Sequence, residues 1–562
     1  LFFKEPRKIE NYILEETEEE ELEPGESNSE EEKTVKKGKR RRNSSGKESE
    51  GSNGGKSPDK GIKISKKLEK NLEYMKKVYS IPINSDIIIR EFSIAVKDKL
   101  VEAFAIYIDG LIDKKTVNES ILKPLMLLST YDSKINNKSI VDYVKDHLLP
   151  QAQVKETRIY EDVIDEVNFG GCGIFVDGAD VAFVADVKGW EHRNVERPNI
   201  ELIIRGPQEG FTEVLQTNTA LVRKIIKDNN LVVESITIGK KSKTPCHMLY
   251  IKDIVNDSLV NQVRKRLKSI KVDYIIDSGE LEQYLEDNTY LSVPQVIDTE
   301  RPDKVAMFLE EGKVGILMNG TPIALVVPAN IVELIKSPED AYIRYPYSNF
   351  LRIIRLLGMI VTLLLPGLYI AITNYHHEMI PTELMFAIEA AREKVPFPSI
   401  IELLILEVSF ELIREAGIRV PGPIGPTLGI IGALILGQAA VAANIVSPIL
   451  IIIVAVAGIG SFAVPTFSFG FGIRISRFFY IVLGAMAGFL GIATGLFING
   501  LWLAAAKSFG VPFLVPFAPM VGKAEYDFII RKAIWKQEWR PDYLNVKRRK
   551  SQSHISRGWT KK

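Results

Sequence analysis

The feature that most constrains this chain is a run of fifty-four residues between Arg419 and Arg474 that contains no Asp, Glu, Lys, Arg or His. About 20 helical residues cross a hydrocarbon layer about 30 Å thick, because each residue advances a helix by about 1.5 Å. The run is therefore long enough for two membrane spans, with a turn at residues 444–448. A second uncharged run, residues 478–506, predicts a third span. The last third of the chain is thus expected to lie in a membrane.

The composition of the whole chain hides this division. The chain is 25% charged and 46% hydrophobic, with a formal net charge of +1, because a soluble part and a membrane part are averaged. It has two cysteines, Cys172 and Cys246, so a disulfide framework is not expected.

Residues 1–72 are predicted to be a disordered, charged tail. An acidic run at residues 15–23 and a basic run at residues 36–42 precede a stretch rich in Ser, Gly and Lys. Such a segment cannot bury enough apolar surface to offset the entropy lost on ordering. The basic run offers an alternative, contact with anionic lipid or nucleic acid, but the solvated tail is the favoured interpretation.

The next part of the chain, up to residue 344, has the pattern of an α/β region. Apolar strands are predicted at residues 103–108 and 173–176, and a helix at residues 218–228. The region is longer than one typical domain. We expect two α/β subdomains, residues 73–155 and 156–344.

Residues 345–522 are predicted to form an α-helical, polytopic membrane domain. Four spans are clear from length and apolarity, and two further segments are marginal because one contains glutamates and the other is short. The clear spans are 356–373, the two arms of the hairpin 428–468, and 478–506; the marginal segments are 400–413 and 508–522.

The basic residues predict the orientation of this domain. Basic loops collect on the cytoplasmic side of a membrane. Arg414, Arg419 and a short basic loop holding Arg474 and Arg477 then lie inside, together with the α/β region and a basic tail at residues 523–562.

Several polar residues of the membrane domain are candidates for a lumen or gate. Glu407 and Glu411 share one helix face with Arg414, and charged groups in a bilayer are costly unless they face water or a partner. A polar lumen and an amphipathic helix at the interface both fit this pattern. The candidate residues are Glu402, Glu407, Glu411, Gln438 and Asn444.

A second set of residues forms a stripe of small side chains in the third clear span. Small residues three and four positions apart let helix backbones approach closely, so the stripe is predicted to be a packing seam. Packing within one chain is favoured over packing between copies. The seam residues are Gly484, Gly488, Gly491, Gly495 and Asn499.

Motifs for catalysis or cofactor binding are weak, and we do not expect an enzyme, a metal or a cofactor. Residues 239–242 resemble the end of a phosphate-binding loop but lack its upstream glycine and its Ser or Thr. His376 and His377 are adjacent rather than one helical turn apart, so they do not form a metal motif.

Several strings along the chain, taken in order, resemble the A subunits of the GerA-type spore germination receptors. The resemblance as a whole runs from about residue 85 to about residue 522. The strings are residues 203–211 and 217–218, 277–282, 299–303, 320–325, 420–427 and 437–440.

This resemblance implies a subunit of a nutrient germinant receptor in the inner membrane of a bacterial spore. It implies three kinds of partner: a transporter-like B subunit, a lipoprotein C subunit and further copies of the chain in an oligomer. Such an oligomer is expected to conduct cations. Its helices are expected to contact membrane lipid, and nucleic acid is not an expected partner. A membrane-anchored scaffold, or a signal-amplifying paralogue without conductance, is the alternative.

Overall fold

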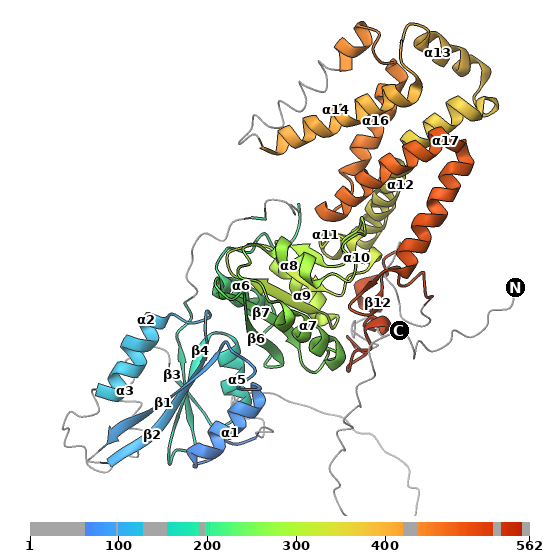
Figure 1. Ribbon diagram of the computed structural model, residues 1–562. Coiled ribbons are helices and arrows are strands. Elements are labelled where there is room, and N and C mark those ends of the chain that lie inside the picture. The colour runs from blue at the N-terminus through green and yellow to red at the C-terminus, as the bar shows by residue number, and fades with distance from the viewer. Residues whose placement is uncertain are drawn as a thin grey trace, which may run out of the picture.

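The computed structural model describes residues 62–96, 99–127, 154–189, 197–198, 201, 203–419, 437–520 and 530–552. Figure 1 shows three parts in a row: a first α/β subdomain in blue, a second in green, and a helical part in yellow to red. The predicted fold class, an α/β region followed by helices, is confirmed at this level.

The first subdomain is a five-stranded antiparallel sheet with helices on both faces. The strand order is β1-β2-β4-β5-β3. Its elements are α1 (Leu68–Val78), β1 (Ile87–Val96), β2 (Lys99–Ile108), α2 (Lys114–Val117), the π-helical turn Asn118–Leu122, α3 (Lys123–Leu127), β3 (Val154–Thr157), α5 (Tyr160–Asn168), β4 (Gly171–Val176) and β5 (Ala182–Asp186).

Alternation of apolar side chains gives this sheet two buried faces. Phe92 and Ile94 face α2 and α3, whereas Phe104 and Phe175 face α1 and α5. Gly173 allows α5 to approach, because a Cβ there would overlap the side chain of Val163.

The second subdomain repeats this layering with the strand order β6-β7-β9-β10-β8. Helices α6 and α9 cover one face, and α7 and α8 cover the other. Its elements are α6 (Leu215–Ile225), β6 (Leu231–Ile238), β7 (Thr244–Ile251), α7 (Asp257–Ser269), α8 (Ser278–Leu285), β8 (Ile297–Thr299), α9 (Pro302–Glu310), β9 (Val314–Met318), β10 (Ala324–Val327), α10 (Ile331–Ile335) and α11 (Glu339–Tyr342).

The boundaries of the first subdomain differ from the prediction. The sequence suggested a division at residue 155, but β4 pairs with β2, and β5 pairs with β3, so residues 154–186 belong to the first sheet. The ordered chain also begins earlier than residue 73, because α1 starts at Leu68. Residues 1–61 of the predicted tail lie outside the described residues.

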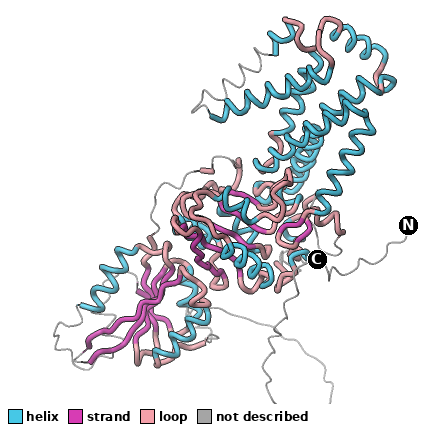
Figure 2. Tube along the Cα trace, viewed as in Figure 1, coloured by secondary structure: helices cyan, strands magenta, loops and turns pink. Residues whose placement is uncertain are grey.

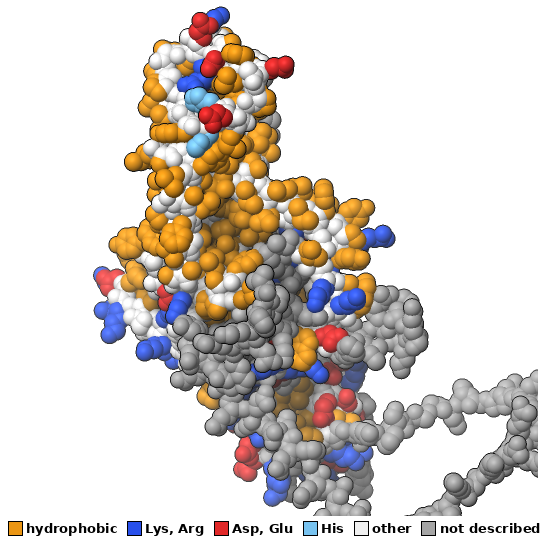
Figure 3. Space-filling model, turned by 90° about the vertical axis from the view of Figure 1, so that its right-hand side faces the viewer, with side chains coloured by type: hydrophobic (Ala, Val, Ile, Leu, Met, Phe, Trp, Pro, Cys, Tyr) orange, Lys and Arg blue, Asp and Glu red, His pale blue; other side chains and the backbone are white. Residues whose placement is uncertain are grey.

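The third part is helical and largely apolar on its surface. Figure 3 shows hydrophobic side chains over the face of this part that is in view, with charged side chains at its far end. Within the described residues, two helices are long and apolar enough to cross a membrane, α12 and α17. The helices are α12 (Tyr345–Tyr375), the 3-10 turn His377–Met379, α13 (Thr382–Arg392), α14 (Ser399–Arg419), α16 (Pro448–Ser461) and α17 (Phe467–Ala505).

Some of the expected spans lie within these helices, and others coincide with them only in part. Residues 356–373 lie within α12, and residues 400–413 lie within α14. Of the expected hairpin 428–468, residues 428–436 lie outside the described residues, a turn occupies residues 443–446, and α16 follows.

Helix α17 is a hairpin rather than the single span predicted for residues 478–506. Its backbone leaves helical geometry at Ala487 and at Gly488, where φ is +57°. Asn499 of the second arm donates a hydrogen bond to Tyr480 Oη of the first arm at 3.1 Å. A straight helix would separate these residues by about 28 Å. The two arms are therefore antiparallel, as Figure 1 shows.

The described part of the segment 508–522, residues 508–520, does not form the expected marginal span. Residues 507–512 form the small hairpin β11 (Lys507–Ser508) and β12 (Val511–Pro512), and Val511, Phe513 and Val515 enter the core of the second subdomain. A short apolar run suits a buried strand as well as a span, which explains the error.

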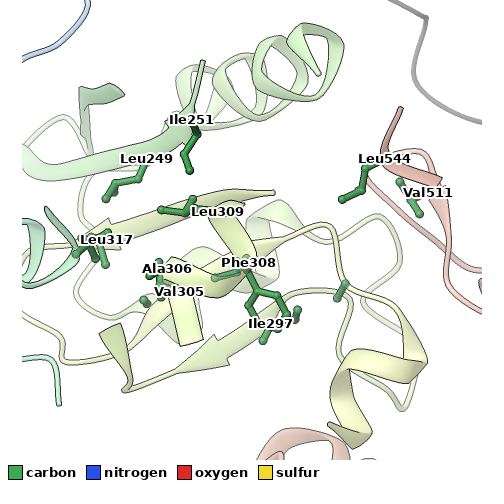
Figure 4. Packing of buried hydrophobic residues seen from close by; sticks show 14 of the residues in the cluster. Leu249, Ile251, Ile297, Val305, Ala306, Phe308, Leu309, Leu317, Val511 and Leu544 are labelled. Carbon is green, nitrogen blue, oxygen red and sulfur yellow. The ribbon is translucent and has the colours of Figure 1, made fainter. Parts of the chain in front are cut away.

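The predicted basic tail also packs against this subdomain over residues 530–552. Tyr543, Leu544 and Val546 are buried in its core, and Figure 4 shows Leu544 beside Val511. Tyr543 Oη donates a hydrogen bond to Glu333 at 2.5 Å. The tail contains the 3-10 turns Ile534–Lys536 and Asp542–Leu544.

The close approach of the two arms of α17 gives a testable prediction. A Cβ at Gly491 would overlap the carbonyl oxygen of Leu483, whereas nothing lies within 4 Å of one at Gly500. Gly491→Ala should therefore lower the stability of the chain in detergent by roughly 1–3 kcal/mol through overpacking. Gly500→Ala is the matched control and should leave the thermal midpoint near that of the native chain. Equal midpoints for the two variants would contradict the hairpin.

Candidate functional site

The most unusual feature of the helical part is a buried arginine–glutamate cluster between α14 and α17. We define it as Glu407, Glu411, Arg414, Arg474 and Arg477. Helix α14 brings the first three residues to one face, as predicted from their spacing. The first arm of α17 brings the two other arginines, which are three residues apart.

The centre of the cluster is the ion pair of Glu407 and Arg477. Arg477 Nη2 lies 2.6 Å from Glu407 Oε2, and both side chains are 0% exposed. The same nitrogen donates a hydrogen bond to Glu411 Oε1 at 3.1 Å. A charged group in an apolar region is tolerated when it faces a partner inside the helix bundle, and each charge here supplies that partner.

Arg414 and Arg474 flank this pair. Arg414 Nη1 and Arg474 Nε each lie 3.5 Å from a carboxylate oxygen of Glu411, and Arg414 Nη2 donates to Ser461 Oγ of α16 at 2.7 Å. Arg414 also lies over the rings of Phe410 and Phe462, which stabilises a partly desolvated guanidinium. The cluster therefore joins α14, α16 and α17.

The other predicted lumen or gate residues lie elsewhere. Glu402 is buried and accepts a hydrogen bond from the backbone N–H of Ser447, at the start of α16. Gln438 and Asn444 are exposed, and Asn444 has a positive φ of 56° in the turn before α16. The structure thus brings together Glu407 and Glu411 but not all five candidates.

The predicted packing seam lies at close approaches within the chain. A Cβ at Gly484 would overlap the carbonyl of Gly367 in α12, and one at Gly495 would overlap the side chain of Leu483 in the first arm of α17. Gly491 and Asn499 make the inter-arm contacts described above.

The remaining seam residue, Gly488, lies at the reversal of α17, which the end of α12 caps. Tyr375 Oη donates hydrogen bonds to the carbonyl oxygens of Ala485 and Met486 at 2.8 and 3.0 Å. The ring of His376, in the segment that follows α12, stacks on Phe489 of α17. Helix α12 therefore fixes the apex of the hairpin.

Polar hydrogen bonds join the second subdomain to the bases of α12 and α17. At the base of α12, Asp340 Oδ2 accepts hydrogen bonds from Arg352 and Arg355 at 3.0 and 2.8 Å. At the base of α17, Ser468 Oγ donates to Asp298 Oδ2 at 2.7 Å. Displacement of this subdomain would act directly on both helices.

A group of carboxyls lies beside the second contact. Burial, with smaller contributions from Asp298 and Glu286, raises the pKa of Glu282 to about 8. Within the described residues, no group of three or more His, Cys, Asp or Glu has an arrangement suited to a metal ion.

A cleft of about 530 Å³ separates the two subdomains. It is lined by polar groups of both signs, including Asp113 and Lys115 from the first subdomain and Glu209 and Lys224 from the second. Beside the cleft, the buried side chain of Arg223 pairs with Asp86 across the subdomains, with Arg223 Nη2 2.8 Å from Asp86 Oδ1. Such a lining could receive a small polar molecule.

Two residues of the cluster were assigned to another role from the sequence. Arg474 and Arg477 were expected in a basic loop, but they lie inside helix α17 with buried side chains. Their spacing of three, which complements the spacing of four between Glu407 and Glu411, is the signal that could have identified the pairing.

Taken together, the fold and the cluster define a membrane-associated protein whose two α/β subdomains adjoin an apolar helical part. Comparison with known proteins agrees with this class. The family model described as "Bacillus/Clostridium GerA spore germination protein" matches residues 73–543. The chain belongs to this GerA family, which confirms the resemblance found in its sequence.

Individual relatives cover most of the chain. Spore germination protein KA of Bacillus subtilis (strain 168) is 40% identical over 484 residues, 86% of this chain and 88% of that protein. Spore germination protein GerLA of Bacillus cereus is 35% identical over 482 residues, 85% of this chain and 97% of that protein.

A solved structure is similar in sequence to about half of the chain. It is the crystal structure of the N-terminal domain of the A subunit of the Bacillus megaterium spore germinant receptor GerK3. It is 31% identical, with a TM-score of 0.39, and covers 49% of this chain and 99% of that one.

The ion pair predicts a specific pattern of stabilities. Glu407→Gln or Arg477→Gln alone leaves a buried charge with fewer partners and should lower stability by about 3 kcal/mol. The double variant removes both charges and should cost less than the sum of the two single variants. Thermal unfolding of the full chain in detergent measures the stabilities of the native chain, the two single variants and the double variant. Additive losses would contradict direct coupling between the two side chains.

The pKa of Glu282 predicts a dependence of stability on pH. Between about pH 5 and pH 8 the unfolded chain loses this proton and the folded chain retains it, so the free energy of unfolding falls as pH rises. Glu282→Gln should flatten this dependence and raise the thermal midpoint at pH 8. Glu69→Gln, at an exposed carboxyl of α1, is the control. A wild-type slope in Glu282→Gln would contradict the shifted pKa.

Proposed function

We propose that this protein is the A-type subunit of a nutrient germinant receptor in the spore inner membrane and that it forms part of an oligomeric, cation-conducting channel. In this role it acts with a transporter-like B subunit and a lipoprotein C subunit. Membership of the GerA family and the names of its relatives support the receptor role. The channel and its opening are the finer part of the proposal.

The arrangement of the helices supports a multi-pass protein with both α/β subdomains and the C-terminal tail in the cytoplasm. Helix α12 begins at the second subdomain, and both ends of α17 pack on the core of that subdomain through Phe469 and Ala506. The helices therefore leave from one side and return to it, and the tail of residues 530–552 lies on the same side. The arginines near this side agree with the distribution of basic residues in membrane proteins.

The observation that carries the channel proposal is the buried pair of Glu407 and Arg477. Outside this charged contact, Phe410 of α14 packs against α16, and Leu403 lies in an apolar cluster with residues of α12, α16 and α17. The charged cluster is thus a bond between α14 and α17 that can exist in made and broken forms. We assign it as the gate: the pair holds α14 in a closed position, and its release exposes Glu407 and Glu411 to an ion pathway.

The apolar outer surface of the helices is available to lipid and to neighbouring copies. Exposed side chains lie on α14, α16 and the second arm of α17, among them Leu412, Ile459 and Phe497. Large exposed apolar surfaces mark lipid or subunit contacts. We assign this surface to contacts with lipid and with neighbouring copies of the chain.

Potassium release from spores tests the gate. The gene is deleted and then restored as the native chain, as Glu407→Gln, as Arg477→Gln, or as Glu378→Gln, an exposed carboxyl outside the cluster. Because each cluster variant breaks the closing bond, potassium release before nutrient addition should rise several-fold. The control variant should behave as the native chain, and immunoblots establish equal protein levels.

Two results would overturn parts of this proposal. Native potassium release from both cluster variants at normal protein level would remove the ion pair from the gate. Normal nutrient-triggered release in the deletion itself would remove the receptor role and leave the scaffold as the better assignment.

A further inference from the structure

One loop of the second subdomain reaches past the base of the membrane helices. Residues 286–292 connect α8 towards β8, and Ser292 at the end of this segment lies beside the first turns of α17. Ser292 Oγ lies 3.3 Å from Ser476 Oγ, and a Cβ at Gly472 would overlap the carbonyl oxygen of Ser292. The loop and this helix are in direct backbone contact, and Figure 1 shows the second subdomain at this base.

The contact between the loop and α17 lies at the level of an apolar stripe on that helix. Phe467, Phe471, Ile475 and Phe479 are spaced by four residues along α17, and each is 44–53% exposed. Such an apolar stripe is the side of a membrane helix that faces lipid. Gly472 and Ser476 lie within the length of this stripe. The loop therefore lies at the level where the surface of α17 is already apolar.

Tyr290 lies two residues before Ser292 in this loop. Its side chain is 93% exposed, whereas the adjacent Leu291 packs against the core of the subdomain. A tyrosine has an apolar ring and a polar hydroxyl, and such side chains are enriched at membrane–water interfaces. Exposed tyrosines also occur on loops in water. The position of this loop beside the apolar stripe of α17 favours a tyrosine at the membrane interface.

The backbone of the loop is held in place by hydrogen bonds. Tyr290 N–H donates to Asn288 Oδ1 at 3.1 Å, and the N–H groups of Asp287 and Asn288 donate to Gln295 Oε1 at 3.2 and 3.1 Å. The carboxylate of Asp287 accepts from Phe509 N–H at 2.9 Å. These bonds turn the acidic group towards the protein and present Tyr290 outward.

We propose that residues 286–292 are a lipid-contact anchor of the second subdomain, with the ring of Tyr290 inserted at the headgroup boundary of the cytoplasmic leaflet. The partner is the phospholipid bilayer itself. The proposal rests on the assignment of α12 and α17 as membrane-crossing helices. It means that the second subdomain moves against lipid as well as against the helices when the receptor switches.

Spin-label accessibility in the full chain tests this anchor. A nitroxide is attached at Tyr290→Cys, at Phe471→Cys on the lipid-facing stripe, or at Leu100→Cys beside the β1–β2 hairpin, where the side chain is 78% exposed. The native thiols, Cys172 and Cys246, are buried, and burial raises the pKa of each to about 12, so they react poorly. The native chain, treated in the same way, measures the background.

The labelled chains are placed in nanodiscs of phosphatidylcholine and phosphatidylglycerol, and the accessibility to oxygen and to a water-soluble nickel chelate is compared. Oxygen partitions into lipid and the chelate stays in water. The ratio of oxygen to chelate accessibility should be several-fold higher at residues 290 and 471 than at residue 100.

Two outcomes would overturn the anchor. A water-like ratio at residue 290 with a lipid-like ratio at residue 471 would place the loop in water and leave the membrane assignment intact. Water-like ratios at both positions would remove the membrane assignment of α17 together with the anchor. Unchanged thermal midpoints in detergent verify that the labelled chains are folded.

Discussion

The structure depends most on the cost of placing Arg477 inside an apolar helical part. A guanidinium cannot lose its charge under ordinary conditions, so its burial requires carboxylates at contact distance. Glu407 and Glu411 provide them, and this need holds α14 against α17 at the cluster. The surrounding helices pack by apolar contact and by glycines that allow close approach, which set spacing but not charge pairing. A contact of this kind is strong while intact and costly once one partner leaves, which are the properties of a two-position gate.

The second subdomain links the proposed gate to the rest of the protein. Its core includes β12, the start of α17 and residues of the C-terminal segment, so the soluble and helical parts share one hydrophobic core. Asp340 at the base of α12 and Asp298 at the base of α17 add polar bonds at the same junction. A displacement of the second subdomain would therefore reach α12 and α17 through packed side chains, and the proposed gate lies two to three turns along the first arm of α17.

Much of the architecture follows from sequence patterns with a local cause. The uncharged run after Arg419 indicated the apolar part, and the apolar segments 103–108 and 173–176 became parts of β2 and β4. The family was identified from short strings along the chain and confirmed by comparison. The division of the sheets was not predictable in this way, because the pairing of β2 with β4 joins residues about seventy positions apart.

The site was only partly predictable for the same reason. The shared face of Glu407 and Glu411 is a local property of one helix, but their pairing with Arg477 depends on how two distant helices pack. The reversal at Gly488 was missed because an apolar helix can continue through a glycine in lipid, and only the capping by Tyr375 marks the turn. Residues 508–522 were assigned to the membrane because the core of a soluble subdomain and a short span have the same composition.

The distance between α14 and α17 tests the central claim most directly. Spin labels at the exposed positions Leu412 and Ile475 report this distance by pulsed electron paramagnetic resonance, in the otherwise native chain and in Glu407→Gln. A second pair at the exposed positions Ile360 and Phe479 reports the packing of α12 on α17. If the ion pair holds α14 closed, the first distance becomes longer or broader in Glu407→Gln and the second stays the same. An unchanged first distance, in a variant that still leaks potassium, would contradict the account.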